Sequence, residues 1–423
     1  MIYTIGNQAA MEALRSVNTE DVPSILKPIA FFTRFQARMV TQLMPLFAPT
    51  NMLRDVAERS ENIRTRKIAG HAGLDMNKVA NQAIGESAKL LMKLKPVMMG
   101  VLAENTPLAK LFPVDNANDD VIALKQFLAL GGSSTYGDML SGDSKSLAEK
   151  LRKTGTISDK AMEAIELWNN SFELISGFSI YKSLVANGVG NKDAATASLN
   201  LMNFRKRGKV MSPLRALYMF AQPIATGGHQ MAMTLSTRRG QVRYAAYTVA
   251  AMALYAMLRS GDDDDELGIN KMDELGNFTL YRNIPIPMGN GMYFKVPVGF
   301  GMQQLAWSHG VNAVRTMLGD MTAGEAVAES AALWARSAMP VSPAETSMLK
   351  NPMVWLAQTF SPQVAKPLVN IALDVNSFGA PLTNARYERQ DMAKSLQGRR
   401  DTPQIYKDIS RVFAQNGIDF YPE

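Results

Sequence analysis

The sequence predicts a mainly α-helical protein, either elongated or built from several helical subdomains, with one β-hairpin near residues 278–300. Three observations support this prediction. Apolar residues recur at spacings of three and four along most of the 423 residues, as they do on the buried face of a helix. A helical chain of this length usually divides into more than one packed unit. One segment differs: it has two proline-bearing arms on either side of a glycine-rich turn, a pattern that is typical of edge strands.

The first helices follow in order from the spacing of apolar residues. An amphipathic helix is expected over residues 22–44 and a polar helix over residues 52–70. An apolar helical stretch should cover residues 76–112. It is interrupted at Pro96 and Gly100, since proline removes a backbone donor and glycine weakens a helix.

Glycines and small polar residues from Gly131 to Asp143 predict a linker. Apolar stripes then predict helices over residues 158–186, 192–204, 300–318, 323–338 (with Trp334 facing inward), 350–373 and 403–416. These elements divide the chain into four expected parts: residues 1–130, a flexible linker over 131–157, a central helical part over 158–277, and residues 278–423.

The predicted hairpin has two extended arms, FTLYRNIPIP and MYFKVPVG, around the turn sequence MGNG. Glycine and asparagine favour the tight turn of a hairpin. Pro285, Pro287 and Pro297 cannot donate to a hydrogen-bonded ladder, so both arms should behave as edge strands.

A short polar motif follows two prolines near the N-terminus. Pro45 and Pro49 disfavour helix at the residue before each of them, so a new helix should begin at about Pro49 to Asn51. Asn51, Arg54 and Asp55 then lie on one face of that helix, at spacings of three and four. We expect this trio to hold two helices together through hydrogen bonds.

Two other interpretations of the motif remain open. In the first, Arg54 pairs with Glu58 on a solvated helix face. Asp55 then pairs with Arg59 on the same face. In the second, the trio contacts a ligand directly. A short motif is only a hypothesis, and the structural role is favoured over ligand binding.

Several segments together resemble a known family. They are the opening YTIGNQAAMEAL, the stretch FAPTNMLRD that carries the polar motif, the hairpin, and the stretch NSFGAPL at residues 376–382. This set resembles the large polyvalent-protein-associated domain, the thirty-eighth of its naming series, along most of the chain. The resemblance implies a helical module of giant phage proteins that are carried in the virion and ejected with the genome. We expect the chain to be a fragment, or a small gene cut from a longer relative.

A basic region precedes an apolar one between residues 205 and 258. Its positive side chains are candidates for contact with DNA phosphates or anionic lipid headgroups: Arg205, Lys206, Arg207, Lys209, Arg238, Arg239 and Arg243. The uncharged run from Tyr244 to Leu258 follows. It is shorter than the roughly 30 Å of a bilayer core, so a buried core helix is favoured over membrane association.

Ala246, Ala250 and Leu254 mark a candidate face of this run for a membrane or for another helix. Ala246 and Ala250 form a small-xxx-small pair, a spacing that lets two helices approach closely. If the helix meets lipid, changing Ala250 and Leu254 to Asp should abolish binding to anionic liposomes.

The residues that usually carry catalysis or metal binding are few and scattered. The chain has no cysteine, and its three histidines, His71, His229 and His309, are far apart without a metal-binding motif. The acidic run from Asp262 to Glu266 has no companion ligands at fixed spacing and should be a solvated loop. We therefore predict no catalytic residues, no metal site, no cofactor and no enzymatic activity.

These observations lead to one functional expectation. The chain should be a non-enzymatic module of a phage internal virion protein, held in the virion interior and then ejected into the host cell envelope or cytoplasm. Expected partners are other ejection or virion proteins, viral DNA and the host membrane, and the chain should form an oligomer. A net charge of +7 is compatible with DNA or anionic lipid. The alternatives are a nucleic-acid-binding structural protein of a mobile element, and a peptidoglycan-cleaving ejection protein whose catalytic domain lies outside this chain.

Overall fold

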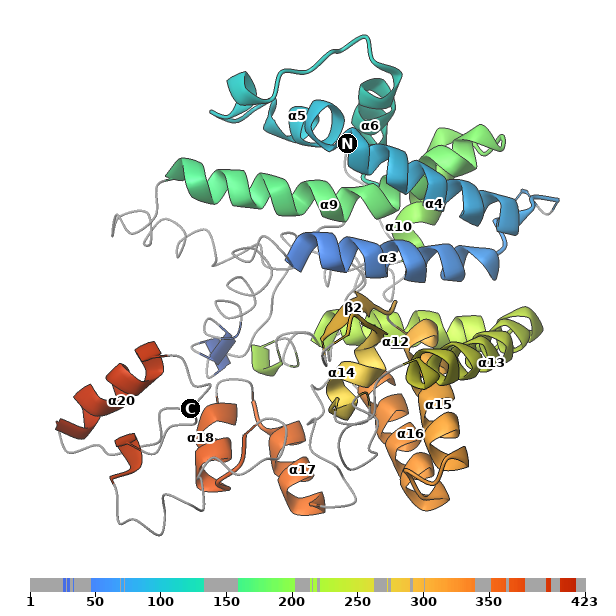
Figure 1. Cartoon of the computed structure of the whole chain (residues 1–423). Coiled ribbons are helices and arrows are strands. Elements are labelled where there is room, and N and C mark those ends of the chain that lie inside the picture. The colour runs from blue at the N-terminus through green and yellow to red at the C-terminus, as the bar shows by residue number, and fades with distance from the viewer. Residues whose placement is uncertain are drawn as a thin grey trace, which may run out of the picture.

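The computed structural model in Figure 1 describes a mainly α-helical protein with a single two-stranded hairpin in its described part. This confirms the predicted fold class. The residues that it describes are 26–27, 29–30, 33, 47–68, 70–71, 73–132, 159–201, 214, 216–218, 221–261, 272, 275–289, 292–299, 301–338, 351–362, 365–376, 393–396 and 404–415. The predicted helix over 22–44 and linker over 131–157 fall largely outside them.

The elements follow one another along the chain as short and medium-length helices. Before the hairpin they are α3 (Phe47–Arg64), α4 (Met76–Met92), the π-helix η2 (Leu94–Met99), α5 (Gly100–Ala103), the 3₁₀-helix η3 (Ala109–Leu111), α6 (Asp119–Ala129), α9 (Asp159–Ala186), α10 (Asn191–Leu201), α12 (Ala221–Leu235), α13 (Arg238–Ser260) and α14 (Asn277–Arg282). Strands β1 (Asn283–Pro287) and β2 (Tyr293–Pro297) come next. After them come α15 (Met302–Met317), α16 (Ala323–Ala338), α17 (Pro352–Phe360), α18 (Lys366–Ala372), the 3₁₀-helix η5 (Lys394–Leu396) and α20 (Gln404–Gln415).

A first hydrophobic core lies among α3, α4, α6, α9 and α10. The long helix α9 runs through its centre, since its apolar residues are buried on more than one side. Phe127 of α6 packs its ring against Phe178 and Tyr181 of α9, at centroid distances of 5.7 and 5.1 Å. Tilted aromatic pairs at such distances add to the stabilisation from buried area. One core therefore joins segments that the sequence prediction had divided at residue 158.

A second hydrophobic core lies among α12 to α16. Trp307 of α15 lies edge-on to Tyr255 of α13 and donates from its indole nitrogen to the Leu280 carbonyl at 2.6 Å. Tyr281 of α14 donates to Asn312 of α15 at 2.6 Å. These bonds satisfy polar atoms that are buried beside apolar side chains, which would otherwise destabilise the core.

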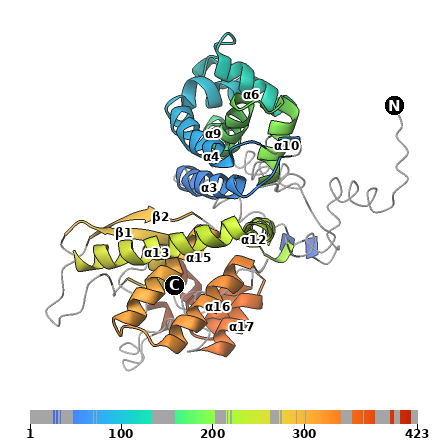
Figure 2. The same cartoon turned by 90° about the vertical axis from the view of Figure 1, so that its right-hand side faces the viewer.

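Helix α3 lies between the two cores. Figure 1 shows α9 and α4 on one side of it, with α12 and α13 on the other, and Figure 2 shows the same layering from the side. The apolar residues Met52 and Ile63 of α3 belong to the first core. Its contacts with α12 and β2 join it to the second. The helix thus connects two layers instead of covering one surface.

The hairpin forms where the sequence predicts it, but its arms are shorter. The strands pair antiparallel, with Ile284 opposite Val296 and Ile286 opposite Phe294. Gly289 in the turn has φ +83°, a left-handed conformation that glycine adopts without strain. The first predicted arm begins as the helix α14, whose Leu280 carbonyl accepts from Trp307 and whose Tyr281 hydroxyl donates to Asn312, both on α15.

Two further expectations differ from the structure. The helix predicted over 350–373 is divided into α17 and α18 by Ser361 and Pro362, since proline disfavours helix at the residue before it. Trp334 of α16 was expected to face inward, yet 37% of its surface is exposed. Its ring covers those of Tyr244 and His309 at the rim of the second core, at 6.5 and 6.4 Å.

Candidate functional site

The most unusual site in the structure is the polar face of α3, which is buried although it is charged. Its buried polar side chains are Asn51, Asp55, Glu58, Arg59, Ser60, Glu61 and Asn62. Charged residues are rarely this buried unless they have partners in the fold. Because both layers cover α3, these side chains meet neighbours on two sides and not solvent.

The predicted trio lies at the start of this face. Asn51 and Asp55 are buried, and the Asn51 amide donates to Asp55 at 3.4 Å. Arg54 is half-buried, and its charge acts on Asp55. This bond joins two residues within α3, so the trio's expected role between helices stays a prediction. The alternative of a solvated face is wrong, because Glu58 and Arg59 are also buried.

The next two residues point to opposite layers. The Glu58 carboxylate faces α12 and the start of α15, where the chain has glycines. A Cβ on Gly227 would lie 3.7 Å from Glu58 Oε1, and one on Gly301 would lie 3.5 Å from it. Arg59 instead extends to α9, with Nη1 3.1 Å from where a Cβ on Gly177 would be. Glycines on three elements thus make room for two charged side chains.

The last turns of α3 bond directly to the second layer. Arg243 of α13 forms an ion pair with Glu61 through two nitrogens, one of them 2.8 Å from Oε2. Tyr247 donates to the same carboxylate at 2.6 Å. Thr234 of α12 donates to Asn62 at 3.0 Å. A bidentate arginine–carboxylate contact fixes both partners in orientation, so these bonds set the angle between α3 and α13.

Two carboxyl groups of this face are poorly suited to carrying a charge. Burial raises the pKa of Asp55 to about 6, although the charges of Arg59 and Arg54 oppose the rise. Burial also raises the pKa of Glu58 to about 7, with the neighbouring Asp55 adding to the rise and Arg59 opposing it. Both groups therefore gain or lose a proton near neutral pH. Carboxyls with raised pKa values also occur in active sites, so burial alone does not decide their role.

The arrangement around α3 is suited to joining layers. Within the described ranges, no group of three or more histidine, aspartate or glutamate side chains is placed to hold a metal ion. His309 of α15 contacts the Tyr244 hydroxyl and lies apart from α3, and burial lowers its pKa. The polar face thus consists of carboxylates, arginines and amides, and its contacts with α12 and α13 hold helices to one another.

Helix α13 is the second candidate site, and its inner face packs very closely on α15. A Cβ on Gly310 would lie 2.7 Å from the Ala251 Cβ and 2.9 Å from the Met252 nitrogen. Such a short separation requires a small residue on each helix. The run from Tyr244 to Leu258 is thus partly a core helix, as predicted.

The outer face of α13 is exposed, which the favoured prediction of a fully buried helix did not anticipate. Ala246 and Ala250 lie on this exposed face. Leu254 is half-buried and packs against the second core, so it does not belong to the same surface. Among the described helices, none is both long enough and apolar enough to cross a membrane.

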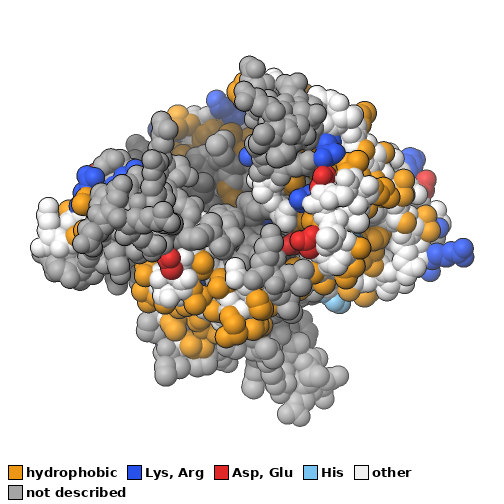
Figure 3. All heavy atoms as spheres, turned by 60° about the horizontal axis from the view of Figure 1, so that its bottom comes forward, with side chains coloured by type: hydrophobic (Ala, Val, Ile, Leu, Met, Phe, Trp, Pro, Cys, Tyr) orange, Lys and Arg blue, Asp and Glu red, His pale blue; other side chains and the backbone are white. Residues whose placement is uncertain are grey.

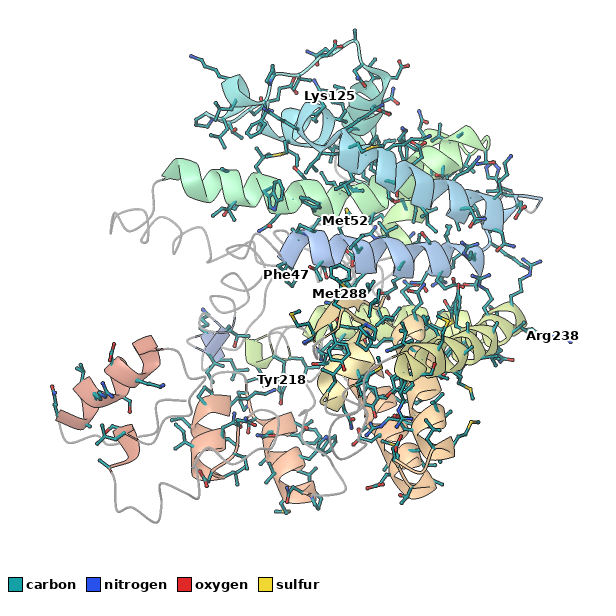
Figure 4. The ribbon with its side chains drawn as sticks, in the orientation of Figure 1. Phe47, Met52, Lys125, Tyr218, Arg238 and Met288 are labelled. Atoms are coloured by element: carbon teal, nitrogen blue, oxygen red, sulfur yellow. The ribbon has the colours of Figure 1, made fainter. Side chains whose placement is uncertain are left out.

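The candidate basic residues are not brought together as one described surface. Arg205, Lys206, Arg207 and Lys209 lie outside the described residues. Arg238 and Arg239 are exposed at the start of α13, and Figure 4 shows Arg238 at the edge of the molecule. Arg243 was expected to face phosphate or lipid, but it is paired with Glu61 inside the fold. The reason is its position one turn before Tyr247, which places both side chains against α3.

Sequence reasoning identified the start of the buried polar face but missed Glu58, Glu61 and Asn62 as contacts between layers. The spacing of polar residues along α3 could have indicated these contacts. Asn51, Asp55, Glu58 and Asn62 recur at spacings of four, three and four, as one stripe of a helix does. Such a polar stripe is usually solvated, and only the second layer explains why this one is buried.

Comparison with known families identifies the C-terminal part of the chain. Residues 270–423 match the model of the family Large polyvalent protein associated domain 38. This range contains the hairpin and residues 376–382, and it excludes the trio at residues 51–55. No curated protein and no solved structure matches the chain. Residues 270–423 are thus similar to Large polyvalent protein associated domain 38, the family that the resemblance predicted, whereas the resemblance over residues 1–269 stays a prediction.

Proposed function

We propose that this chain is a non-enzymatic module of a large polyvalent phage protein, carried inside the virion and ejected into the host together with the genome. The observation that carries this proposal is the match of residues 270–423 to Large polyvalent protein associated domain 38. In this role the module has no reaction to perform. It packs against other ejected proteins and helps them to form a path for the genome across the envelope.

The surface of the matched segment supports a packing role. Figure 3 shows hydrophobic side chains gathered over α17 and α18, where Met353, Leu356, Phe360 and Leu368 are exposed. The hairpin adds a second apolar surface around its turn, where Figure 4 labels Met288, and Met292 and Phe294 are exposed beside it. Contiguous exposed apolar surface commonly marks a site of contact with another protein or a membrane.

A nucleic-acid-binding structural protein is the second candidate. The net charge of +7 and the exposed pair Arg238 and Arg239 favour it. Binding of this kind depends on phosphate neutralisation and weakens steeply as salt rises. Contacts through apolar surfaces do not show that dependence, so salt titration separates the two candidates.

Mass spectrometry of purified virions tests the proposal. Peptides from this chain should be protected from protease in intact particles of the phage that encodes it. They should leave the particles when genome release is triggered. Peptides that are missing from purified virions, or that stay with emptied particles, would contradict the proposed role. Steep salt-dependent DNA binding by a chain missing from virions would favour the second candidate.

A further inference from the structure

One long stretch of the chain carries positive charge and no negative charge. Residues 194–261 contain nine lysines and arginines but neither aspartate nor glutamate, although the whole chain has 45 basic and 38 acidic residues. The basic residues are Arg205, Lys206, Arg207, Lys209, Arg215, Arg238, Arg239, Arg243 and Arg259. The described part of the stretch lies mainly in α10, α12 and α13. Basic residues gathered in this way are typical of proteins that bind polyanions.

The arginines of α13 divide into two groups. Arg243 and Arg259 turn inward, where each pairs with a carboxylate. Arg238 and Arg239 are exposed in the first turn, and no carboxylate of the described residues pairs with either. The positive end of the helix dipole lies at this turn and favours acidic residues there. The stability of α13 therefore does not explain the position of these two arginines.

A second basic segment lies beside them, although it is distant in the sequence. Residues 64–67, with the sequence RTRK, form the end of α3 and the start of the loop that follows. The Thr65 hydroxyl is 3.4 Å from that of Thr234, and the Thr234 carbonyl accepts from Thr237, the N-cap of α13. Figure 1 shows the end of α3 and one end of α13 on the same side of the molecule, where Figure 4 labels Arg238. The fold thus brings two basic segments to one edge.

The fold does not neutralise the charges of the second segment. Arg66 is half-buried and donates to the uncharged side chain of Gln230 on α12. Lys67 is exposed. Glu61, one turn earlier on α3, is already bound through two nitrogens of Arg243. A net positive charge therefore remains at this edge for a partner from outside the chain.

We call Arg66, Lys67, Arg238 and Arg239 the basic edge, and we propose that it binds the phosphates of double-stranded DNA without reading the base sequence. A guanidinium group matches a phosphate in shape and can bind it through two nitrogens, and a lysine adds a compact charge. A rigid duplex carries one charge per about 1.7 Å of its axis. Such closely spaced phosphates can meet cations that two separate elements hold in fixed positions.

The surroundings of the basic edge favour a duplex over a membrane. Side chains beside its cations in the sequence are polar, as are the exposed Ser236 and Gln241 and the half-buried Thr65. A helix that lies on a membrane instead places large apolar side chains beside its cations to enter the lipid. Val242 is 62% exposed one turn after Arg238, but one valine buries little area. Binding to a single strand usually needs aromatic rings for stacking, and the basic edge has none.

This contact is compatible with both functions proposed above, because a genome accompanies an ejected module and a mobile-element protein alike. It does not rest on either of them. Purified full-length chain and synthetic DNA test it without any virion. Failure of this test would therefore leave the virion role untouched, and absence from virions would leave the basic edge untouched.

Fluorescence anisotropy of a labelled duplex of about 20 base pairs measures the binding at several salt concentrations. Each phosphate that the protein neutralises contributes about −0.9 to the slope of log affinity against log salt. The four cations of the basic edge therefore predict a slope of about −3.6. Affinity should then fall roughly 150-fold between about 50 and 200 mM salt.

The double substitution Arg238→Gln with Arg239→Gln tests the basic edge. It removes two phosphate contacts, so it should weaken binding at least about tenfold at about 50 mM salt and make the slope shallower by about 1.8. The melting temperature should not fall, since these arginines oppose the helix dipole. Lys67→Gln tests the other segment independently and should make the slope shallower by about 0.9.

The matched control is Lys95→Gln with Lys110→Gln, which removes the same net charge elsewhere. Both lysines are exposed on the first layer, in the segments on either side of α5. Figure 1 shows α5 far from the side of the molecule where Figure 4 labels Arg238. This control should bind the duplex like the parent and with the same slope.

Several results would overturn the proposal. One is a parent that does not bind the duplex at about 50 mM salt. Another is an arginine double variant that binds like the parent. A control that loses as much affinity as the arginine variant would show that net charge, and not the basic edge, is responsible. Flotation with phosphatidylserine vesicles separates the remaining case: if the parent floats, the arginine variant does not, and both bind DNA alike, the partner is anionic lipid.

Discussion

The substitution Glu58→Gln should stabilise the protein at neutral and alkaline pH and leave its stability at acidic pH almost unchanged. Glu58 is buried between α3, α12 and the start of α15. Burial raises the pKa of its carboxyl from the ordinary value of 4.5 to about 7. The folded chain therefore holds this proton more tightly than the unfolded chain. As pH rises from 4.5 to about 7, the free energy of unfolding should fall, and above that range this contribution should stay level.

The magnitude follows from the difference between the two pKa values. Each pKa unit corresponds to roughly 1.4 kcal/mol, so ionising Glu58 inside the fold costs up to roughly 3 kcal/mol. Glutamine has nearly the same size and polarity and never carries the charge. The variant should be more stable than the parent by up to roughly 3 kcal/mol at about pH 8, with little difference near pH 4.5. Its neighbour Asp55 should also lose a proton more readily, because the Glu58 charge no longer opposes its ionisation.

Urea unfolding followed by circular dichroism at several pH values between 4.5 and 8 measures this effect. Glu329→Gln on α16 is the matched control, since the same change there is made away from α3. The control should follow the parent at every pH. If Glu58→Gln were less stable than the parent at about pH 8, Glu58 would be a charged and well-paired group, and the reasoning from burial would be refuted.

Three other substitutions test the packing of the two layers. Gly310→Ala should lower the free energy of unfolding by roughly 1–3 kcal/mol in thermal melts, because its Cβ meets the backbone of α13; a variant as stable as the parent would show that α13 and α15 can separate. Arg243→Met should cost roughly 1–3 kcal/mol, since the buried Glu61 carboxylate loses its two-nitrogen partner and keeps Arg64 only at 3.7 Å. Adding Glu61→Gln should restore part of that loss, and a purely additive double variant would argue against the pair. Lys182→Met should destabilise the protein at neutral pH and should matter less as pH falls. Burial raises the pKa values of the partner carboxyls of Glu86 and Asp120, but Lys182 more than offsets this and holds both pKa values below their ordinary range.

The sequence predicts the helices of this fold well wherever apolar residues occupy one stripe. The predicted helices over 158–186 and 403–416 correspond closely to α9 and α20. The prediction is poorest where a segment contacts two layers. The polar stripe of α3 has the pattern of a solvated surface, and only the position of the second layer explains its burial. Likewise, the uncharged run in α13 is compatible with core, membrane and exposed helix, since periodicity does not reveal which partner lies on each face.

The central claim is that this chain travels in the virion and enters the host, and isotope labelling tests it most directly. Virions grown on isotope-labelled cells would infect unlabelled cells, and the host envelope and cytoplasm would then be analysed by mass spectrometry. The proposal predicts labelled peptides from this chain in those fractions soon after infection, together with labelled peptides of other ejected proteins. Labelled peptides that stay entirely with the particles outside the cell would contradict it.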